Sequence, residues 1–374
     1  MTVTAIDEEK TMEGDRERKT MKGIAHKQYG RPEPGVLDLG EVDVPVPEDD
    51  QVLVRVYASS VNPVEWYGVT GPYFARVGAG YRKPKDPRVG ADLAGVVAAV
   101  GREVQDLAPG DEVFGSGSGA WAEYAVARAT RVALKPANVS FEEAATVPIA
   151  GLTALQALRD HGQLQPGQKV LINGASGGVG TFAVQLAKAF GADVTAVCST
   201  RNVEQARALG ADRVVDYTTE DFTNLGIRHD LMVDIAGGRS FLACRRALKA
   251  DATFVLVGGK MTYRGLGPLP HIAGTILKSR FRSQKTTFFV AKITREHLSV
   301  TRDLIEAGKV RPVVERTYPL SEACDALAYL GEGHARGKVA ITATGELGST
   351  SSAVSASGQA IAATSAAISD SVAS

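Results

Sequence analysis

The sequence carries one glycine-rich turn that could hold a phosphate-containing cofactor. Residues 173–180 read NGASGGVG and stand between the apolar run KVLI and the helix-like run TFAVQLAK. Glycine at 177 lets the backbone approach a pyrophosphate, glycine at 180 lets the helix lie close to the strand, and free N–H groups at the helix start face the anion. The alternative is a plain tight connection, but the flanking elements favour a dinucleotide site. The predicted contacts are Gly174, Ala175, Ser176, Gly177, Gly178, Val179 and Gly180.

The end of the next strand-like run indicates which dinucleotide would bind. About twenty residues after such a turn, an Asp or Glu holds the adenosine ribose 2′-hydroxyl of NAD. Residues 198–202 read CSTRN instead, with no carboxylate. The hydroxyl of Ser199 beside the guanidinium of Arg201 suits a 2′-phosphate, so the pattern predicts NADPH, with Asn202 at the same end. In the alternative interpretation Ser199 caps a helix and Arg201 is a solvated side chain.

Strand-like and helix-like runs alternate around these segments. Between residues 146 and 283 the runs KVLING, DVTAVCS, RVVDY, DLMVDIAG and ATFVLVGG alternate with helical stretches. This α/β alternation is typical of a doubly wound parallel sheet, a Rossmann domain. Residues 21–145 show short β-like runs broken by Gly and Pro, which is typical of a β-barrel or sandwich. The strand-like run GKVAIT at residues 337–342 is expected to return to that first domain.

Composition excludes several classes of protein. The 374 residues include 42 basic and 42 acidic ones, so any binding to nucleic acid or an anionic membrane must be local. Three distant cysteines, Cys198, Cys244 and Cys324, offer neither a disulfide framework nor a multi-cysteine zinc site. No signal core or membrane span is found, so a cytoplasmic protein is predicted.

Both ends of the chain differ from the rest. Residues 1–20 are charged and nearly without apolar side chains, and residues 345–374 are rich in Ser and Ala. Neither can offset the entropy of ordering, so a disordered N-terminal extension and a disordered tail are expected. Met21, which opens the first apolar run, is an alternative start.

Several segments together resemble the zinc-independent, zeta-crystallin-like quinone oxidoreductases of the medium-chain dehydrogenase/reductase superfamily. The resemblance covers residues 21–342. It implies a GroES-like β-barrel domain from residues 21–145 and 284–344, an inserted Rossmann NADPH-binding domain at 146–283, and a homodimer. The segments are SSVNPVEWYGVTG (59–71), VGADLAGVVAAVG (89–101), PGDEVFG (109–115), the glycine turn, LGADRVVDY (209–217) and ARGKVAI (335–341).

The resemblance also implies site residues outside the turn. Asn62 resembles the family asparagine near the nicotinamide, and Tyr67 resembles its nearby tyrosine. Tyr217 resembles the tyrosine near the adenosine, while Val257 and Gly258 are expected to run under the nicotinamide ribose. In the plainer interpretation Asn62 forms an Asn-Pro turn and the tyrosines are packing aromatics.

No metal site is predicted. Zinc alcohol dehydrogenases of the superfamily use a Cys, the His of a GHE motif and a second Cys or Asp. By resemblance, Asn62 stands near the first ligand and residues 90–92, GAD, replace the motif, so Asp92 is expected to be structural. Glu65 stands where many relatives have Asp, which weakens a role for its carboxylate. The histidines show no ligand spacing: His26, His161, His229, His271, His297 and His334.

Without a Lewis acid, the expected hydride acceptor is one that is already electrophilic, a quinone or an α,β-unsaturated carbonyl. Tyr67 is the candidate proton donor and Asn62 the second candidate catalytic residue. Two alternatives remain open: an NAD(P)-dependent alcohol dehydrogenase, and a non-catalytic NADPH-binding sensor.

Two basic clusters also have open interpretations. The first, in the Gly- and Pro-rich segment after Tyr67, could steer an anionic substrate, although a solvated loop is the preferred interpretation. The second, LPHIAGTILKSRFRSQK at residues 269–285, allows a helix on a membrane surface or a subunit contact, while a helix packed on the Rossmann domain is favoured. The first cluster comprises Arg76, Arg82, Lys83, Lys85 and Arg88.

Overall fold

The computed structural model describes residues 19–259, 269–279 and 283–343. The first pair of strands is antiparallel: β1 (Thr20–His26) runs against β2 (Leu37–Asp43). Strand β1 therefore begins at the last residue of the predicted N-terminal extension. The remainder of that extension up to residue 18, and the predicted tail, lie outside the described residues.

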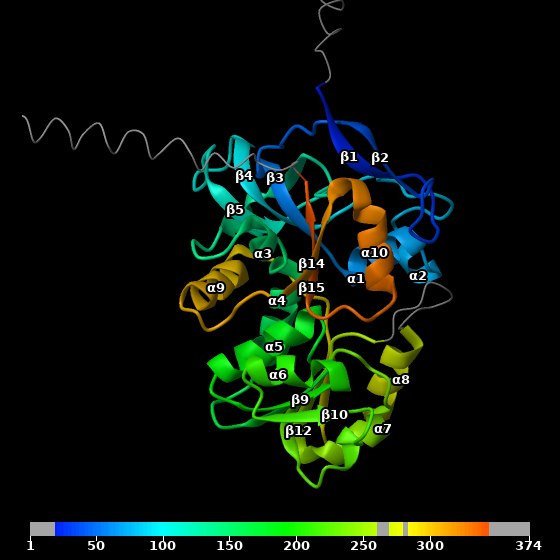
Figure 1. The fold of residues 1–374 in the computed structure, drawn as a ribbon, viewed down its shortest axis with the longest axis vertical. Coiled ribbons are helices and arrows are strands. Elements are labelled where there is room, and N and C mark those ends of the chain that lie inside the picture. Colours follow the sequence, from blue (N-terminus) through cyan, green and yellow to red (C-terminus); the bar gives the residue numbers. More distant parts are fainter. Residues whose placement is uncertain (1–18, 260–268, 280–282, 344–374) are drawn as a thin grey trace, which may run out of the picture. The chain divides into compact units, whose positions relative to one another are not determined.

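A six-stranded sheet forms the part of the chain in which strand-like and helix-like runs alternate (Figure 1). Its order is β10-β9-β8-β11-β12-β13 and every neighbouring pair is parallel. This is the 3-2-1-4-5-6 order of dinucleotide-binding sheets, which confirms the predicted Rossmann fold. The strands are β8 (Lys169–Asn173), β9 (Asp193–Cys198), β10 (Arg213–Asp216), β11 (His229–Asp234), β12 (Leu248–Leu256) and β13 (Lys285–Phe288). The helices between them are α5 (Gly178–Ala189), α6 (Val203–Ala208), α7 (Phe241–Cys244) and α8 (Leu269–Ser279).

A seven-stranded sheet contains strands from both ends of the described chain. Its order is β14-β15-β3-β4-β5-β7, with β6 also paired to β3. The late strand β15 runs antiparallel to β3, so the last strand is built into the sheet of the first half. This is the GroES-like part of the predicted fold. Its strands are β3 (Gln51–Val61), β4 (Asp92–Val100), β5 (Glu112–Ser116), β6 (Tyr124–Arg128), β7 (Val132–Leu134), β14 (Val314–Pro319) and β15 (Lys338–Thr342).

Short helices connect and cover these sheets. Helix α4 (Pro148–Leu155) continues into a π-helical turn at Gln156–His161. Helix α8 packs against α7 and β13, which matches the interpretation favoured for residues 269–285, a helix packed on the Rossmann domain. The remaining helices are α1 (Pro63–Thr70), α2 (Tyr73–Arg76), α3 (Phe141–Ala145), α9 (Arg295–Glu306) and α10 (Ala323–Gly331).

The largest hydrophobic cluster surrounds α5. Phe182 and Leu186 of α5 pack with Leu152 and Leu155 of α4 and with Ile172 of β8, and all five side chains are fully buried. Burying each such side chain contributes roughly 1.5–3 kcal/mol. The cluster therefore fixes α5, and with it the glycine turn at its start.

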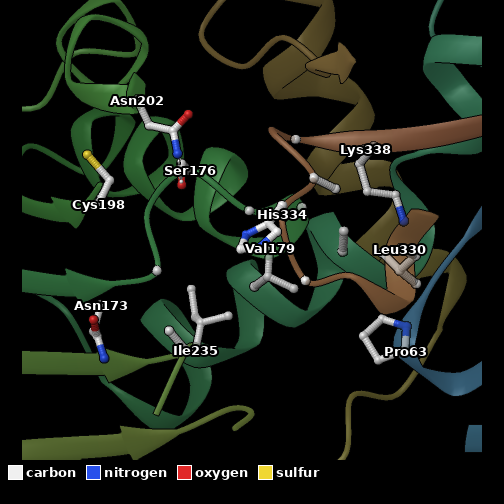
Figure 2. Close-up of a pocket in the computed structure, with 18 of the residues that line it drawn as sticks. Pro63, Asn173, Ser176, Val179, Cys198, Asn202, Ile235, Leu330, His334 and Lys338 are labelled. Atoms are coloured by element: carbon white, nitrogen blue, oxygen red, sulfur yellow. Dashed lines mark hydrogen bonds between the residues drawn. The ribbon is translucent and has the colours of Figure 1, made fainter. Parts of the chain in front are cut away.

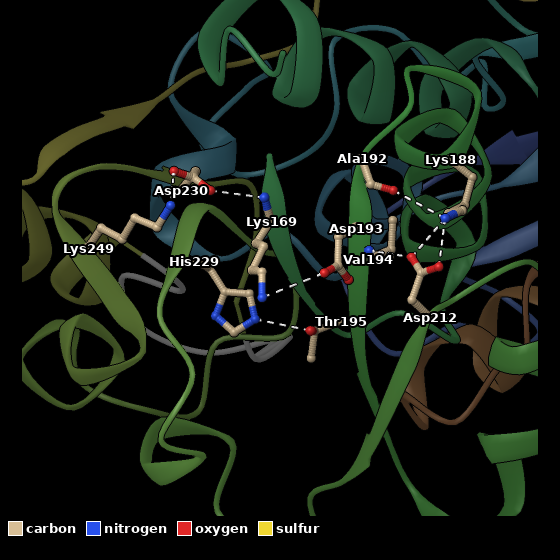
Figure 3. A network of polar contacts seen from close by, with 10 residues as sticks. All are labelled: Lys169, Lys188, Ala192, Asp193, Val194, Thr195, Asp212, His229, Asp230 and Lys249. Carbon is tan, nitrogen blue, oxygen red and sulfur yellow. Dashed lines mark hydrogen bonds and ion pairs between the residues drawn. The ribbon is translucent and has the colours of Figure 1, made fainter. Parts of the chain in front are cut away.

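A polar network ties together the amino-terminal ends of four parallel strands (Figure 3). Asp230 accepts from the Lys169 backbone N–H at 2.9 Å and from Lys249 Nζ at 2.7 Å. His229 is buried between the Ala247 carbonyl and the Thr195 hydroxyl, each 3.0 Å from a ring nitrogen. Burial lowers the pKa of His229, so the ring is neutral with its proton on Nδ1, facing the carbonyl. Ligands of such sheets bind at the opposite edge, so this network stabilises the fold.

Candidate active site

A cleft of about 320 Å³ opens at the carboxyl ends of β8, β9 and β11. Figure 2 shows Ser176, Cys198 and Asn202 at one end of it and Pro63 and Lys338 at the other. The cleft brings together ten of the predicted site residues: Asn62, Gly174, Ser176, Gly177, Gly178, Val179, Ser199, Arg201, Asn202 and Tyr217.

The glycine turn has a specific steric need at each of two positions. Gly174 has φ +90°, a conformation that L side chains rarely adopt. A Cβ on Gly180 would lie 2.1 Å from the Gly174 carbonyl oxygen, so only glycine allows the helix to lie this close to the strand. At Gly177 the nearest atom to such a Cβ is 3.7 Å away, because that position faces the open cleft. The turn therefore packs tightly at Gly174 and Gly180 and leaves open space at Gly177, on the side that faces the cleft.

Helix α5 begins at Gly178, next to the cleft, and Gly177 provides no side-chain cap. The first N–H groups of a helix have no acceptor within the helix, and the helix dipole adds partial positive charge there. This end of the cleft can therefore bind an anionic group.

Polar side chains at the end of β9 form the second part of the cleft. Asn202 Nδ2 donates to Ser176 Oγ at 3.0 Å and to Ser199 Oγ at 3.1 Å, while its buried Oδ1 has no partner among the described residues. The guanidinium of Arg201 donates to the carbonyl of His334 at 2.5 Å. Tyr217 is exposed and lines the same end. Together these residues offer one fixed positive charge and several hydrogen-bonding groups.

Asn62 is buried, and both polar atoms of its side chain form hydrogen bonds. Its Nδ2 donates to Asp92 Oδ2 at 2.9 Å and to Ser60 Oγ at 3.3 Å, and its Oδ1 accepts from Lys338 Nζ. Its backbone N–H donates to Glu65 Oε2 at 2.9 Å, which caps α1. The Asn62 side chain is therefore held in one orientation beside the cleft.

Lys338 is the site residue that sequence reasoning missed. It is 3% exposed, lines the cleft, and donates to the Val61 carbonyl at 3.1 Å as well as to Asn62. Its side chain lies against the start of α5, since a Cβ on Gly178 would be 2.9 Å from Lys338 Cδ. The only sequence signal is a lone base in the apolar run GKVAIT, which a solvated strand end would also show.

Two buried carboxyls accompany this lysine. Burial and the neighbouring Asp92 raise the pKa of Glu65 to about 7, and burial raises the pKa of Asp92 as well. Burial lowers the pKa of Lys338, and the two carboxyls counteract that change. Asp92 also accepts from the Ile149 backbone N–H at 3.0 Å, so it joins β4 to α4, in agreement with the structural role expected for it.

Five predicted site residues do not line the described cleft. Ala175 and Gly180 are buried beneath the turn. Val257 and Gly258 both donate to the Asp234 carbonyl after β12, and the following residue, Gly259, reaches the cleft instead. Tyr67 is half-buried with its ring edge-on to Phe74, and burial raises its pKa. Their roles stay predictions.

In the described part of the chain no three His, Cys, Asp or Glu side chains gather as a metal site. Within the same residues no helix is long and apolar enough to cross a membrane. The cysteines are free, with Cys198 and Cys244 buried.

A parallel sheet in this order, with a glycine turn opening a helix onto a cleft beside a second sheet, defines a dinucleotide-dependent dehydrogenase or reductase. Comparisons agree. The alcohol dehydrogenase GroES-like domain matches residues 48–137, and the zinc-binding dehydrogenase family matches residues 209–341.

Individual similar proteins indicate which dehydrogenases or reductases this chain is related to. A chloroplast envelope quinone oxidoreductase homolog from Arabidopsis thaliana is 35% identical, covering 86% of this chain and 98% of its own length. An NADPH-dependent alkenal/one oxidoreductase of the same plant is also 35% identical, covering 86% and 80%. The quinone oxidoreductase structure from Coxiella burnetii superimposes with a TM-score of 0.77 at 31% identity, covering 87% and 100%. This chain belongs to the medium-chain dehydrogenase/reductase family, with the quinone oxidoreductases.

Proposed function

We propose that this protein is an NADPH-dependent reductase that delivers hydride to a quinone or an α,β-unsaturated carbonyl without a metal. The observation that carries the proposal is the cleft itself, which joins the uncapped start of α5 to a guanidinium at the end of β9. The names of the plant relatives, a quinone oxidoreductase homolog and an alkenal/one oxidoreductase, support the same acceptor class.

The residues of the cleft fit NADPH. The N–H groups at the start of α5 would hold the pyrophosphate. Arg201 and Ser199 would hold the 2′-phosphate, with the guanidinium exchanging the His334 carbonyl for a stronger charged acceptor. The unpartnered Oδ1 of Asn202 is an acceptor suited to a ribose hydroxyl, and Tyr217 would lie against the adenosine.

The opposite end of the cleft suits the reaction. Bound NADPH supplies the hydride. Val61, Pro63, Ile149 and Leu330 give this end apolar walls, which orient an acceptor and exclude water. A quinone or enone that gains hydride becomes a delocalised oxyanion, so orientation and a hydrogen-bond donor suffice. Tyr67, one helical turn after Pro63 in α1, is the proposed donor on the strength of the family resemblance, and to reach an acceptor its side chain would have to turn from Phe74 toward the cleft.

Lys338 and Asn62 are positioning residues in this proposal. The Lys338 ammonium contacts Asn62, which by resemblance stands near the first zinc ligand of the alcohol dehydrogenases. A fixed cation there repels a second one, which favours metal-independent chemistry.

We further propose a homodimer in the cytoplasm. The homodimer follows from the family resemblance. The location rests on sequence alone, and the envelope homolog and a mitochondrial NAD(P)H oxidoreductase relative from mouse make organelles the competing locations.

Steady-state kinetics test the proposal. Purified protein should oxidise NADPH faster than NADH with 1,4-benzoquinone or an alkenal, and should not reduce NADP⁺ with a simple alcohol. Alcohol-dependent reduction of NADP⁺ would identify an alcohol dehydrogenase. Tight NADPH binding without turnover of any acceptor would identify a sensor.

A further inference from the structure

The segment between α1 and β4 presents apolar side chains to solvent. Tyr73, Val77 and Tyr81 are 59%, 83% and 71% exposed, although their neighbours in the chain include buried residues. We call residues 73–85 the outer loop. Isolated exposed apolar residues are ordinary, but three within nine positions need an explanation, and we call these three side chains the patch.

The outer loop is held in a defined shape. Arg76 Nε donates to the Gly71 carbonyl at 2.6 Å, and its guanidinium lies 4.6 Å from the centre of the Tyr29 ring. The Tyr29 hydroxyl in turn donates to the Gly80 carbonyl at 2.7 Å. Contacts with Tyr29, in the segment that follows β1, therefore hold the outer loop in place.

Basic residues follow the patch directly in the chain. Arg82, Lys83 and Lys85 are exposed, and among the described residues none of them forms an ion pair with a carboxylate. The nearest acid in the sequence, Asp86, is already paired with Arg88 at 2.7 Å. The outer loop thus contains four basic residues and no acidic one, on a chain whose net charge is zero, and three of the four, Arg82, Lys83 and Lys85, are exposed.

We propose that the outer loop docks the protein on an anionic lipid bilayer. Tyrosine and a small apolar side chain next to lysine and arginine suit the interface between headgroups and acyl chains. A nucleic acid or an acidic protein would use the bases and leave the apolar patch in water, so the bilayer accounts for both features. Binding would be peripheral.

Docking would place the active site near the bilayer. Phe74 of the outer loop contacts Tyr67 of α1, with ring centres 5.3 Å apart, and Pro63 of the same helix lines the cleft. An acceptor with an apolar tail could then reach the cleft from the bilayer. The docking itself does not rest on the proposed reductase activity.

Vesicle co-sedimentation tests the proposal. The full chain should bind vesicles of phosphatidylcholine with phosphatidylglycerol, but not vesicles of phosphatidylcholine alone, and should be released by high salt. Each base near an anionic surface contributes about fivefold in partition, so removing all three should weaken binding about 100-fold. The charge variant is Arg82→Gln, Lys83→Gln and Lys85→Gln together.

Two further variants separate the contributions. Tyr73→Ser, Val77→Ser and Tyr81→Ser together should weaken binding about tenfold or more, because the apolar contact is lost. A matched control removes three exposed bases elsewhere, Arg131→Gln, Arg228→Gln and Lys309→Gln, and should bind within about twofold of the original chain. NADPH oxidation with a water-soluble quinone, measured on every variant, reports folding and reductase activity separately from docking.

Three results would overturn the proposal. The first is no binding of the original chain to anionic vesicles at low salt. The second is an equal loss in the control variant. The third is loss only in the charge variant together with equally tight binding to duplex DNA, which would define a general polyanion surface.

Discussion

Replacing Lys338 by methionine should weaken NADPH binding and lower the thermal midpoint. Methionine keeps the length of the side chain but removes the charge and the donors to Val61 and Asn62. Leaving Asp92 and Glu65 without their buried counter-charge costs roughly 3–5 kcal/mol, which lowers the Tm by about 6–10 °C. Because Glu65, with a pKa of about 7, can take up a proton, the loss should be smaller below pH 7 than above it.

The effect on the cofactor is worked from the same contacts. Lys338 lies beside the start of α5 and orients Asn62, and losing a charged hydrogen-bonding group costs about 1.5–3 kcal/mol. The Kd for NADPH, measured by fluorescence titration, should therefore rise about 10- to 100-fold.

Lys135 provides the matched control. Its side chain is also buried, donating to the Pro136 and Val139 carbonyls at 3.1 and 2.9 Å, and it is absent from the cleft lining. Lys135→Met should lower the Tm while leaving NADPH affinity unchanged. If Lys338→Met lowers the Tm to the same extent but keeps the original affinity, Lys338 is purely structural and the reasoning is refuted.

Three other predictions concern the glycine turn, the proposed 2′-phosphate site and the buried carboxyl of Glu65. Gly180→Ala should lower the free energy of unfolding by more than about 2 kcal/mol, since its Cβ would lie 2.1 Å from a backbone oxygen. Gly177→Ala should fold normally and lose NADPH affinity. Equal Tm losses in the two variants would contradict this description of the packing. Arg201→Ala should raise the KM for NADPH about tenfold and leave the KM for NADH unchanged, and a parallel rise in both would remove Arg201 from the 2′-phosphate site. Burial and Asp92 raise the pKa of Glu65 from 4.5 to about 7, so between these pH values the folded state keeps a proton that the unfolded chain releases. The contribution of Glu65 to stability therefore falls as the pH rises from about 4.5 to about 7. Thermal unfolding at several pH values should show this slope in the original chain and not in Glu65→Gln.

Periodicity was enough to predict the parallel sheet, because buried parallel strands are continuous apolar runs and the helices between them have their own spacing. The glycine turn was predictable for a similar reason, since Gly174 and Gly180 meet local steric needs within a few residues. The pairing of β15 with β3 joins positions far apart in the chain. The strand-like run GKVAIT after the helical stretches led to the expectation that it returns to the first domain, and the resemblance to a known family then gave the bounds of the shared domain.

The buried charges around Asn62 could not be predicted from sequence. Lys338, Asp92 and Glu65 come from three separate segments, and each looks like an ordinary surface residue in isolation. Their role is visible only in the folded chain, where an ammonium and two carboxyls are buried together and their pKa values change. The carbonyl of His334 beside Arg201 is likewise a contact over a long sequence separation that no local pattern encodes.

The most direct test of the central claim is the rate of NADPH oxidation with 1,4-benzoquinone, measured on a sample whose metal content is determined at the same time. We expect turnover from protein with far less than one metal ion per chain, unchanged by a chelator. Turnover that rises in proportion to bound zinc, or that ceases on chelation and returns with zinc, would contradict the account.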